Sequence, residues 1–203
     1  MNTPIRIIVA EDQGMVLSAL ARLLALEPDI EVVGRASDGL AAWRLLNELA
    51  ADLLVSDIEM PGLSGLDLAQ KIKAQGLPVQ VLIVTTFGRP GYLRRALDAG
   101  VRGYLLKDQP SEELVAAVRR IAAGQRVIAA QLAEAAWSEP NPLGERERSV
   151  LRLAEEGKGN KEIARLLGLS PGTVRNYLHE AAQKLGAANR VEATRIARAS
   201  GWL

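Results

Sequence analysis

Short apolar runs alternate with amphipathic stretches over the first 124 residues. The runs are rich in β-branched residues and almost free of charge, which is typical of strands buried on both faces of a sheet. They lie at 5–9, 30–34, 53–56, 79–85 and 103–106. Apolar residues recur at spacings of three and four, as in helices, over 13–27, 39–50, 64–75, 89–99 and 111–124. Five strand–helix units in this order predict an α/β domain with a doubly wound, five-stranded parallel sheet.

A different pattern follows this α/β segment. Residues 125–142 (QRVIAAQLAEAAWSEPNP) break the alternation, and their Pro-rich end predicts a linker that is partly helical. From Leu143 onward the periodicity is helical only, at 145–156, 161–168, 171–185 and 190–199. The chain is therefore predicted to contain an α/β domain (1–124), a linker (125–142) and an all-α four-helix domain (143–203).

Composition and charge narrow the possible functions. Cys is absent, which excludes disulfides and thiolate metal sites and fits the reducing cytoplasm, where we expect the protein to work. No signal peptide or uncharged apolar run suggests membrane insertion. Residues 157–203 carry 8 Lys/Arg against 3 Asp/Glu, whereas residues 1–126 carry 14 against 15. The basic C-terminal segment indicates contact with a polyanion, most often nucleic acid, although a solvated basic surface would have the same composition.

Charged and polar residues follow four of the predicted strands. Parallel sheets bind ligands beyond the carboxyl ends of their strands, so these side chains should meet at one rim. The rim would contain Glu11 and Asp12 after the first strand, Asp57 after the third, Thr85 after the fourth and Lys107 after the fifth. Solvated loop residues are the alternative, but the convergence of four strand ends that carry these residue types is unusual for such loops.

Three carboxylates at one rim favour a bound cation, because they would otherwise repel one another. Hard oxygen ligands without His or Cys favour Mg²⁺ or Mn²⁺. Asp12 and Asp57 are the expected direct ligands, with Glu11 bound directly or through water and the backbone carbonyl of Glu59 as a further oxygen. With a lysine and a hydroxyl added, the rim fits phosphoryl transfer to a carboxylate. Asp57 would be the nucleophile, and Lys107 and Thr85 would contact phosphoryl oxygens.

The predicted α/β domain resembles the receiver domain of bacterial response regulators. Besides the rim residues, the match includes Met60-Pro61-Gly62 and Gly103-Tyr104, and it covers residues 5 to about 124. The resemblance implies a CheY-like fold and phosphorylation of Asp57 by a partner histidine kinase, here expected to be a membrane sensor. It further implies that Thr85 then moves inward and that Tyr104 changes from exposed to buried, although Tyr104 could also be plain core. Thr86 departs from the family, which often has Ala or Gly there and Pro where this chain has Asp108.

The basic C-terminal segment contains two amphipathic helices separated by a three-residue turn. Asn160 is a predicted cap of the first helix, and Ser170 followed by Pro171 is a predicted start of the second. This is the helix-turn-helix pattern, whose second helix enters the major groove of DNA. Arg and Asn read base edges, so we expect base contacts from Arg175, Asn176 and His179. Phosphate contacts are expected from Lys161, Thr173, Tyr177, Lys184 and Arg190.

This C-terminal domain resembles the LuxR-type DNA-binding domain of the NarL/FixJ class. The matching stretches include Glu145-Arg146-Glu147, Asn160-Lys161-Glu162-Ile163-Ala164, Thr173-Val174-Arg175 and Asn189-Arg190-Val191-Glu192-Ala193, with Gly144 at a cap position that usually holds Thr or Ser. The resemblance implies a response regulator that is not an enzyme, forms homodimers on phosphorylation and binds double-stranded promoter DNA. The stretch TTFGRPGYLRRALDAG looks most like regulators of membrane-lipid desaturation in a thermosensing two-component system.

Two other functions remain open from the residues alone. An aspartyl-phosphate phosphatase would use the same rim for turnover, but it needs a substrate cap rather than a reader helix. A constitutive DNA-binding protein with a degenerate receiver is the second alternative, and the complete set of acids, hydroxyl and lysine argues against it.

Overall fold

A computed structural model describes residues 3–86, 90–128 and 141–203 of the chain. The chain forms two compact units, with the β-sheet in the first and the four C-terminal helices in the second. None of the helices in these ranges is both long and apolar enough to cross a membrane.

The first unit is built on a parallel sheet with strand order β2-β1-β3-β4-β5-β6. Its strands are β1 (Ile5–Ala10), β2 (Ile30–Ala36), β3 (Leu53–Ser56), β4 (Gln80–Thr85), β5 (Gly103–Leu106) and β6 (Val127–Ile128). The α/β prediction is confirmed, but the sheet has a sixth strand. β6 pairs with β5 through Gly103 and Tyr104 and lies within the predicted linker. Its two residues are too few for a periodic pattern, and most of that linker (129–140) is outside the described residues.

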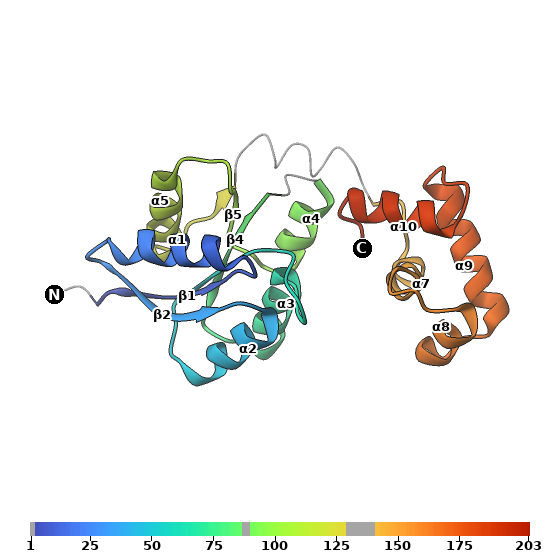
Figure 1. Ribbon diagram of the computed structural model, residues 1–203, viewed down its shortest axis with the longest axis horizontal. Helices are drawn as coiled ribbons and strands as arrows, with labels where there is room; N and C mark the ends of the chain where they lie inside the picture. Colours follow the sequence, from blue (N-terminus) through green and yellow to red (C-terminus); the bar gives the residue numbers. More distant parts are fainter. Residues whose placement is uncertain (1–2, 87–89, 129–140) are drawn as a thin grey trace. The chain divides into compact units, whose positions relative to one another are not determined.

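Helices cover both faces of this sheet (Figure 1). They are α1 (Gly14–Ala25), α2 (Gly39–Glu48), α3 (Gly65–Gln75), α4 (Pro90–Asp98) and α5 (Ser111–Ala122). In Figure 1, α1 and α5 lie on one side of the sheet and α2 and α3 on the other. The core includes Leu24 of α1, Val118 of α5 and the central strand residues Ile7, Val55 and Leu82, all at most 1% exposed. Residues from elements distant in sequence thus hold the strand ends in register.

The second unit contains α7 (Glu145–Glu155), α8 (Asn160–Leu167), α9 (Pro171–Lys184) and α10 (Arg190–Ala199). Its separate core includes Val150, Ile163, Val174 and Ala193, each 0% exposed. Gly168 has a left-handed conformation (φ 65°) and ends α8, which produces the short turn before α9. This is the predicted four-helix arrangement with a helix-turn-helix.

The observed N-cap residues can be compared with the predicted ones. Ser170 caps α9, accepting a hydrogen bond from the Thr173 N–H at 3.0 Å, as predicted. The other cap prediction misses by one residue, because the N-cap of α8 is Gly159 and not Asn160. Asn160 is instead the first residue of the helix, a shift too small for local propensity to resolve.

Candidate phosphoacceptor site and DNA-reading helix

Three carboxylates meet at the carboxyl ends of β1 and β3. The two strands pair with Ala10 opposite Ser56, so the residues that follow them emerge side by side. One carboxylate oxygen from each of Glu11, Asp12 and Asp57 lies within 4.8 Å of the others. Glu11 is 0% exposed and Asp57 6% exposed, whereas Asp12 is exposed. The predicted acidic rim therefore forms in the structure.

Lys107 brings a cation from the end of β5 into this acidic cluster. Its Nζ lies 2.7 Å from Oε2 of Glu11 and 3.0 Å from Oδ2 of Asp57. The backbone N–H of Lys107 donates to the carbonyl oxygen of Thr85 at 2.8 Å, which fixes the end of β5 against the end of β4. Its peptide bond to Asp108 is trans, because the described residues contain no cis peptide bond.

Burial and ion pairing have opposite effects on the pKa values of Glu11 and Lys107. Burial raises the pKa of the Glu11 carboxyl, although the hydrogen bond from Lys107 opposes this rise. For Lys107, burial acts to lower the pKa of the ammonium, but hydrogen bonds to Glu11 and Asp57 outweigh burial and the pKa is raised. Lys107 is therefore charged at neutral pH, and one ammonium faces three carboxyl groups in the cluster.

The acidic cluster has the chemistry of a divalent-cation site. All three side chains offer hard oxygen ligands that are close enough to share one ion, and a single lysine leaves their charge only partly compensated. Glu11, Asp12 and Asp57 are the side chains that would hold the ion. The side chain of Glu59 is half-buried two residues beyond Asp57.

The remaining predicted phosphoryl-binding residues lie on β4, on β5 and in the loop after β4. Thr85 ends β4 with 0% exposure, and Tyr104 on β5 is also 0% exposed, so both already occupy inward positions. Thr86 is exposed at the start of the loop that follows β4.

Two glycines shape the loop after Asp57, and the sequence patterns did not reveal this. A Cβ at Gly65 would lie 2.1 Å from the carbonyl oxygen of Asp57, and one at Gly39 would lie 1.9 Å from the carbonyl oxygen of Leu63. The Gly65 N–H donates to the carbonyl oxygen of Ile58 at 2.9 Å, and the Gly39 N–H donates to the carbonyl oxygen of Pro61 at 3.1 Å. Backbone therefore packs directly on backbone around the loop that follows Asp57.

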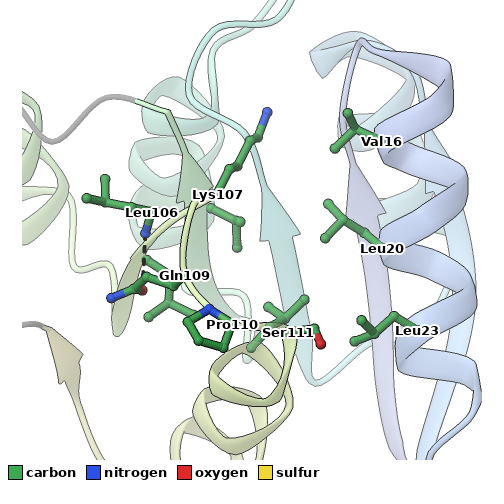
Figure 2. A pocket seen from close by; sticks show the side chains of 11 residues that line it. Val16, Leu20, Leu23, Leu106, Lys107, Gln109, Pro110 and Ser111 are labelled. Carbon is green, nitrogen blue, oxygen red and sulfur yellow. Dashed lines mark hydrogen bonds between the residues drawn. The ribbon is translucent and has the colours of Figure 1, made fainter.

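An apolar cavity of about 160 Å³ adjoins the rim between α1 and the start of α5. Figure 2 shows Val16, Leu20 and Leu23 of α1 pointing toward Pro110 and Ser111. Lys107 also lines this cavity, and Figure 2 shows its ammonium pointing away from the apolar side chains.

On the second unit, α9 presents a polar surface that includes the predicted base-reading residues. Arg175, Asn176 and His179 are exposed, whereas Thr173 and Tyr177 are half-buried. The Thr173 hydroxyl lies 2.8 Å from the Ser170 hydroxyl at the helix cap. Exposed Arg and Asn side chains on the second helix of a helix-turn-helix are well suited to major-groove contacts.

The other predicted phosphate contacts differ in their surroundings. Lys161 is exposed at the start of α8. Arg190 is half-buried, and its guanidinium donates to the carbonyl oxygens of Lys158 and Ala154 at 3.0 and 3.3 Å. Lys184 donates to the buried carboxylate of Glu147 at 2.8 Å. Sequence patterns identified both residues as basic but could not show their internal partners.

Comparison with known proteins agrees with both units. The response regulator receiver domain family matches residues 7–119, and the LuxR family of bacterial regulatory proteins matches residues 141–197. A parallel α/β receiver followed by a helix-turn-helix defines a DNA-binding response regulator. The chain belongs to the NarL/FixJ family of response regulators, which are transcription regulators rather than enzymes.

Relatives cover nearly the whole chain. The transcriptional regulatory protein DesR of Bacillus subtilis is 48% identical over 198 residues, which is 98% of both chains. The uncharacterized transcriptional regulatory protein YvfU of the same organism is 47% identical and covers 98% of this chain and 100% of YvfU. Among solved structures, the RcsB–DNA complex has a TM-score of 0.66 at 26% identity, covering 97% of this chain and 99% of RcsB. The response regulator ChrA has a TM-score of 0.57 at 33% identity over the full length of both chains.

Proposed function

We propose that Asp57 is the phosphoacceptor of this response regulator and that Mg²⁺ or Mn²⁺ is held by Glu11, Asp12 and Asp57. The observation that carries the proposal is the meeting of these three carboxylates within 4.8 Å, with the Lys107 ammonium 3.0 Å from Asp57. A carbonyl oxygen of Glu59 is the proposed fourth protein ligand. When bound, the ion supplies positive charge next to the phosphoryl oxygens.

The phosphoryl group moves from a histidine kinase to the rim in one displacement. An oxygen of Asp57 forms the new bond to phosphorus while the phosphorus–nitrogen bond of the kinase phosphohistidine breaks. Lys107 then pairs with a phosphoryl oxygen, and the Thr85 hydroxyl donates to another. Thr85 and Tyr104 are the proposed switch residues, because both are buried on the neighbouring strands β4 and β5, and Thr85 is the last residue of β4.

Phosphorylation is proposed to favour homodimers, and each dimer presents two α9 helices to a repeated promoter half-site. Holding two reader helices together strengthens binding through effective concentration. Arg175, Asn176 and His179 are the proposed base contacts, and Lys161, Thr173 and Tyr177 the proposed phosphate contacts. One solved relative consists of two RcsB dimers bound to two parallel DNAs, which supports this mode of binding.

Intact mass after incubation with acetyl phosphate and Mg²⁺ tests the phosphoacceptor directly. The wild type should gain one phosphoryl group and Asp57→Ala none. Asp108→Ala is a matched control, because Asp108 is an acid next to Lys107 in the chain and its loss should leave phosphorylation intact. Equal phosphorylation of the wild type and Asp57→Ala would contradict the assignment, and no phosphorylation of either would indicate a degenerate receiver.

We propose a membrane sensor kinase as the phosphodonor and membrane-lipid desaturase genes as the targets. The motif around residues 85–100 and the 48% identity to DesR support this assignment. Binding of the phosphorylated protein to a desaturase promoter, compared with a promoter of equal length and base composition, tests it. Equal affinity for the two promoters would remove the desaturase assignment and leave the phosphoacceptor proposal unaffected.

A further inference from the structure

An ion pair between Lys184 and Glu147 joins the C-terminal end of α9 to the N-terminal end of α7. Lys184 is the last residue of α9, and Glu147 lies in the first turn of α7. The Lys184 ammonium lies 2.8 Å from both carboxylate oxygens of Glu147. Glu147 also accepts a hydrogen bond from the N–H of Gly144 at 2.6 Å, so its carboxylate is held from two sides.

The burial of the two partners is unequal. Glu147 is 3% exposed, and among the described residues of the second unit no other acid is buried. The Lys184 side chain is 45% exposed. A buried carboxylate that loses its cation is strongly unfavourable, so the ion pair holds Lys184 in place. Because the positive charge of Lys184 is compensated at 2.8 Å, it adds little to the attraction between the protein and a DNA phosphate.

The ion pair lies at the opposite end of α9 from the proposed base-reading residues. Arg175 and Asn176 lie near the start of α9, and Lys184 is its final residue. With a rise of about 1.5 Å per residue, their separation of eight or nine positions corresponds to about 13 Å along the helix. A helix released at one end can change its tilt in the major groove, and a small tilt displaces the side chains that must meet base edges.

We propose that Lys184 is a positioning residue for DNA recognition, which acts through Glu147 to set the orientation of α9. This replaces its expected role as a phosphate contact and rests on the proposed use of α9 as the reader helix. Glu147 becomes a second determinant of specificity, although it is buried and carries the wrong charge to touch DNA.

The salt dependence of DNA binding distinguishes a positioning role of Lys184 from a direct phosphate contact. Each phosphate contact made by a lysine adds about 0.9 to the slope of log K against log salt concentration. The probes are a duplex selected by the wild-type protein from a randomised library of short duplexes and a scrambled duplex of the same length. Lys161→Met is the matched control, because Lys161 is an exposed lysine on the same unit with a proposed phosphate contact.

The expected result is a selective loss of recognition. Lys184→Met and Glu147→Gln should each weaken binding to the selected duplex about tenfold, with no change in the salt slope or in binding to the scrambled duplex. The double variant should be no weaker than the weaker single variant, since both changes remove one interaction. Lys161→Met should instead lower the slope by about 0.9 on both duplexes.

Two results would overturn the proposal. One is a slope lowered by about 0.9 on both duplexes in Lys184→Met, which would make Lys184 a phosphate contact. The other is unchanged binding to the selected duplex in Lys184→Met. If circular dichroism shows that Glu147→Gln fails to fold, Lys184→Gln replaces it. Gln can still donate a hydrogen bond to Glu147, so it should restore most of the affinity lost with Met. Failure of the wild-type protein to select any duplex would contradict the proposed DNA-binding role of α9 instead.

Discussion

The Lys107 ammonium lies 2.7 Å from a carboxylate oxygen of Glu11, and this carboxylate is 0% exposed. The contact joins the end of β5 to the end of β1 across the rim. The Lys107 ammonium therefore contacts a carboxylate, that of Glu11, which is also a proposed ligand of the metal ion. Lys107 and a divalent cation therefore compete for the same carboxylate.

Replacing Lys107 should strengthen divalent-cation binding. In Lys107→Met, Glu11 and Asp57 lose their shared positive neighbour, and we expect an affinity for Mn²⁺ about tenfold higher, equivalent to about 1.4 kcal/mol. Titration followed by the electron paramagnetic resonance of free Mn²⁺ measures this change. Lys73→Met is the control, because Lys73 lies in the last turn of α3 and donates to the backbone carbonyl oxygen of Asp98 rather than to a rim carboxylate. Weaker Mn²⁺ binding in Lys107→Met would show that Lys107 supports the metal site rather than competing with it.

The pairing of Arg119 with Asp29 predicts a pH-dependent contribution to stability. The guanidinium donates to both oxygens of Asp29 at 2.8 and 2.7 Å, and this hydrogen bonding holds the pKa of Asp29 below its ordinary value of 3.8. Because the pKa is lower in the folded state, the contribution to stability is present above pH 3.8 and is lost as pH falls through the folded value.

Thermal unfolding of Arg119→Gln measures this contribution. Its melting temperature should lie below that of the wild type at neutral pH, and the difference should shrink as pH falls below 3.8. Arg120→Gln is the control, because Arg120 is the next residue of α5 and its Nε donates to the uncharged side chain of Gln125. A melting difference for Arg119→Gln that stays constant across this pH range would exclude the Asp29 pair as its source.

The close packing of Gly65 predicts that a single methyl group disturbs the loop that follows Asp57. In Gly65→Ala the new Cβ would lie 2.1 Å from the Asp57 carbonyl oxygen, so backbone must shift. We expect a loss of about 1–3 kcal/mol in the free energy of unfolding, together with slower phosphorylation by acetyl phosphate. Urea unfolding and intact mass measure the two effects.

Gly14→Ala is the matched control for Gly65→Ala. Gly14 is the first residue of α1, and apart from its chain neighbours and the backbone of its own helix no atom lies within 4 Å of a Cβ built there. Gly14→Ala should therefore be neutral or stabilising by up to about 1 kcal/mol. Equal stability of Gly65→Ala and Gly14→Ala would show that the loop after Asp57 can rearrange without cost.

Arg175 is exposed on the reader helix, and its removal should reduce sequence discrimination. Arg175→Ala is expected to cost about 1–3 kcal/mol on the selected duplex and to relax specificity at one base pair. Binding to a panel of single-base variants of that duplex measures the effect. An equal loss on every duplex would identify Arg175 as a phosphate contact.

Local patterns in the sequence determined the elements and the residue types at the rim. Short uncharged apolar runs placed the first five strands, and apolar residues at spacings of three and four placed the helices, because both signals depend on residues only a few positions apart. The acids after β1 and β3 and the lysine after β5 could be predicted to meet, because parallel strands end at one edge. The cap at Ser170 was correct for the same local reason, since its partner is three residues away.

Only the tertiary structure decided which partners these side chains take. β6 gains its hydrogen bonds from β5, and its two residues hold no periodic signal of their own. Lys107 bonds to Glu11, which is 96 positions away in the chain, and Lys184 to Glu147, which is 37 positions away. A basic residue has the same local pattern whether it faces a phosphate or a buried carboxylate. The physical reason is that the burial of its partner is set by packing between distant helices, which no local sequence window contains.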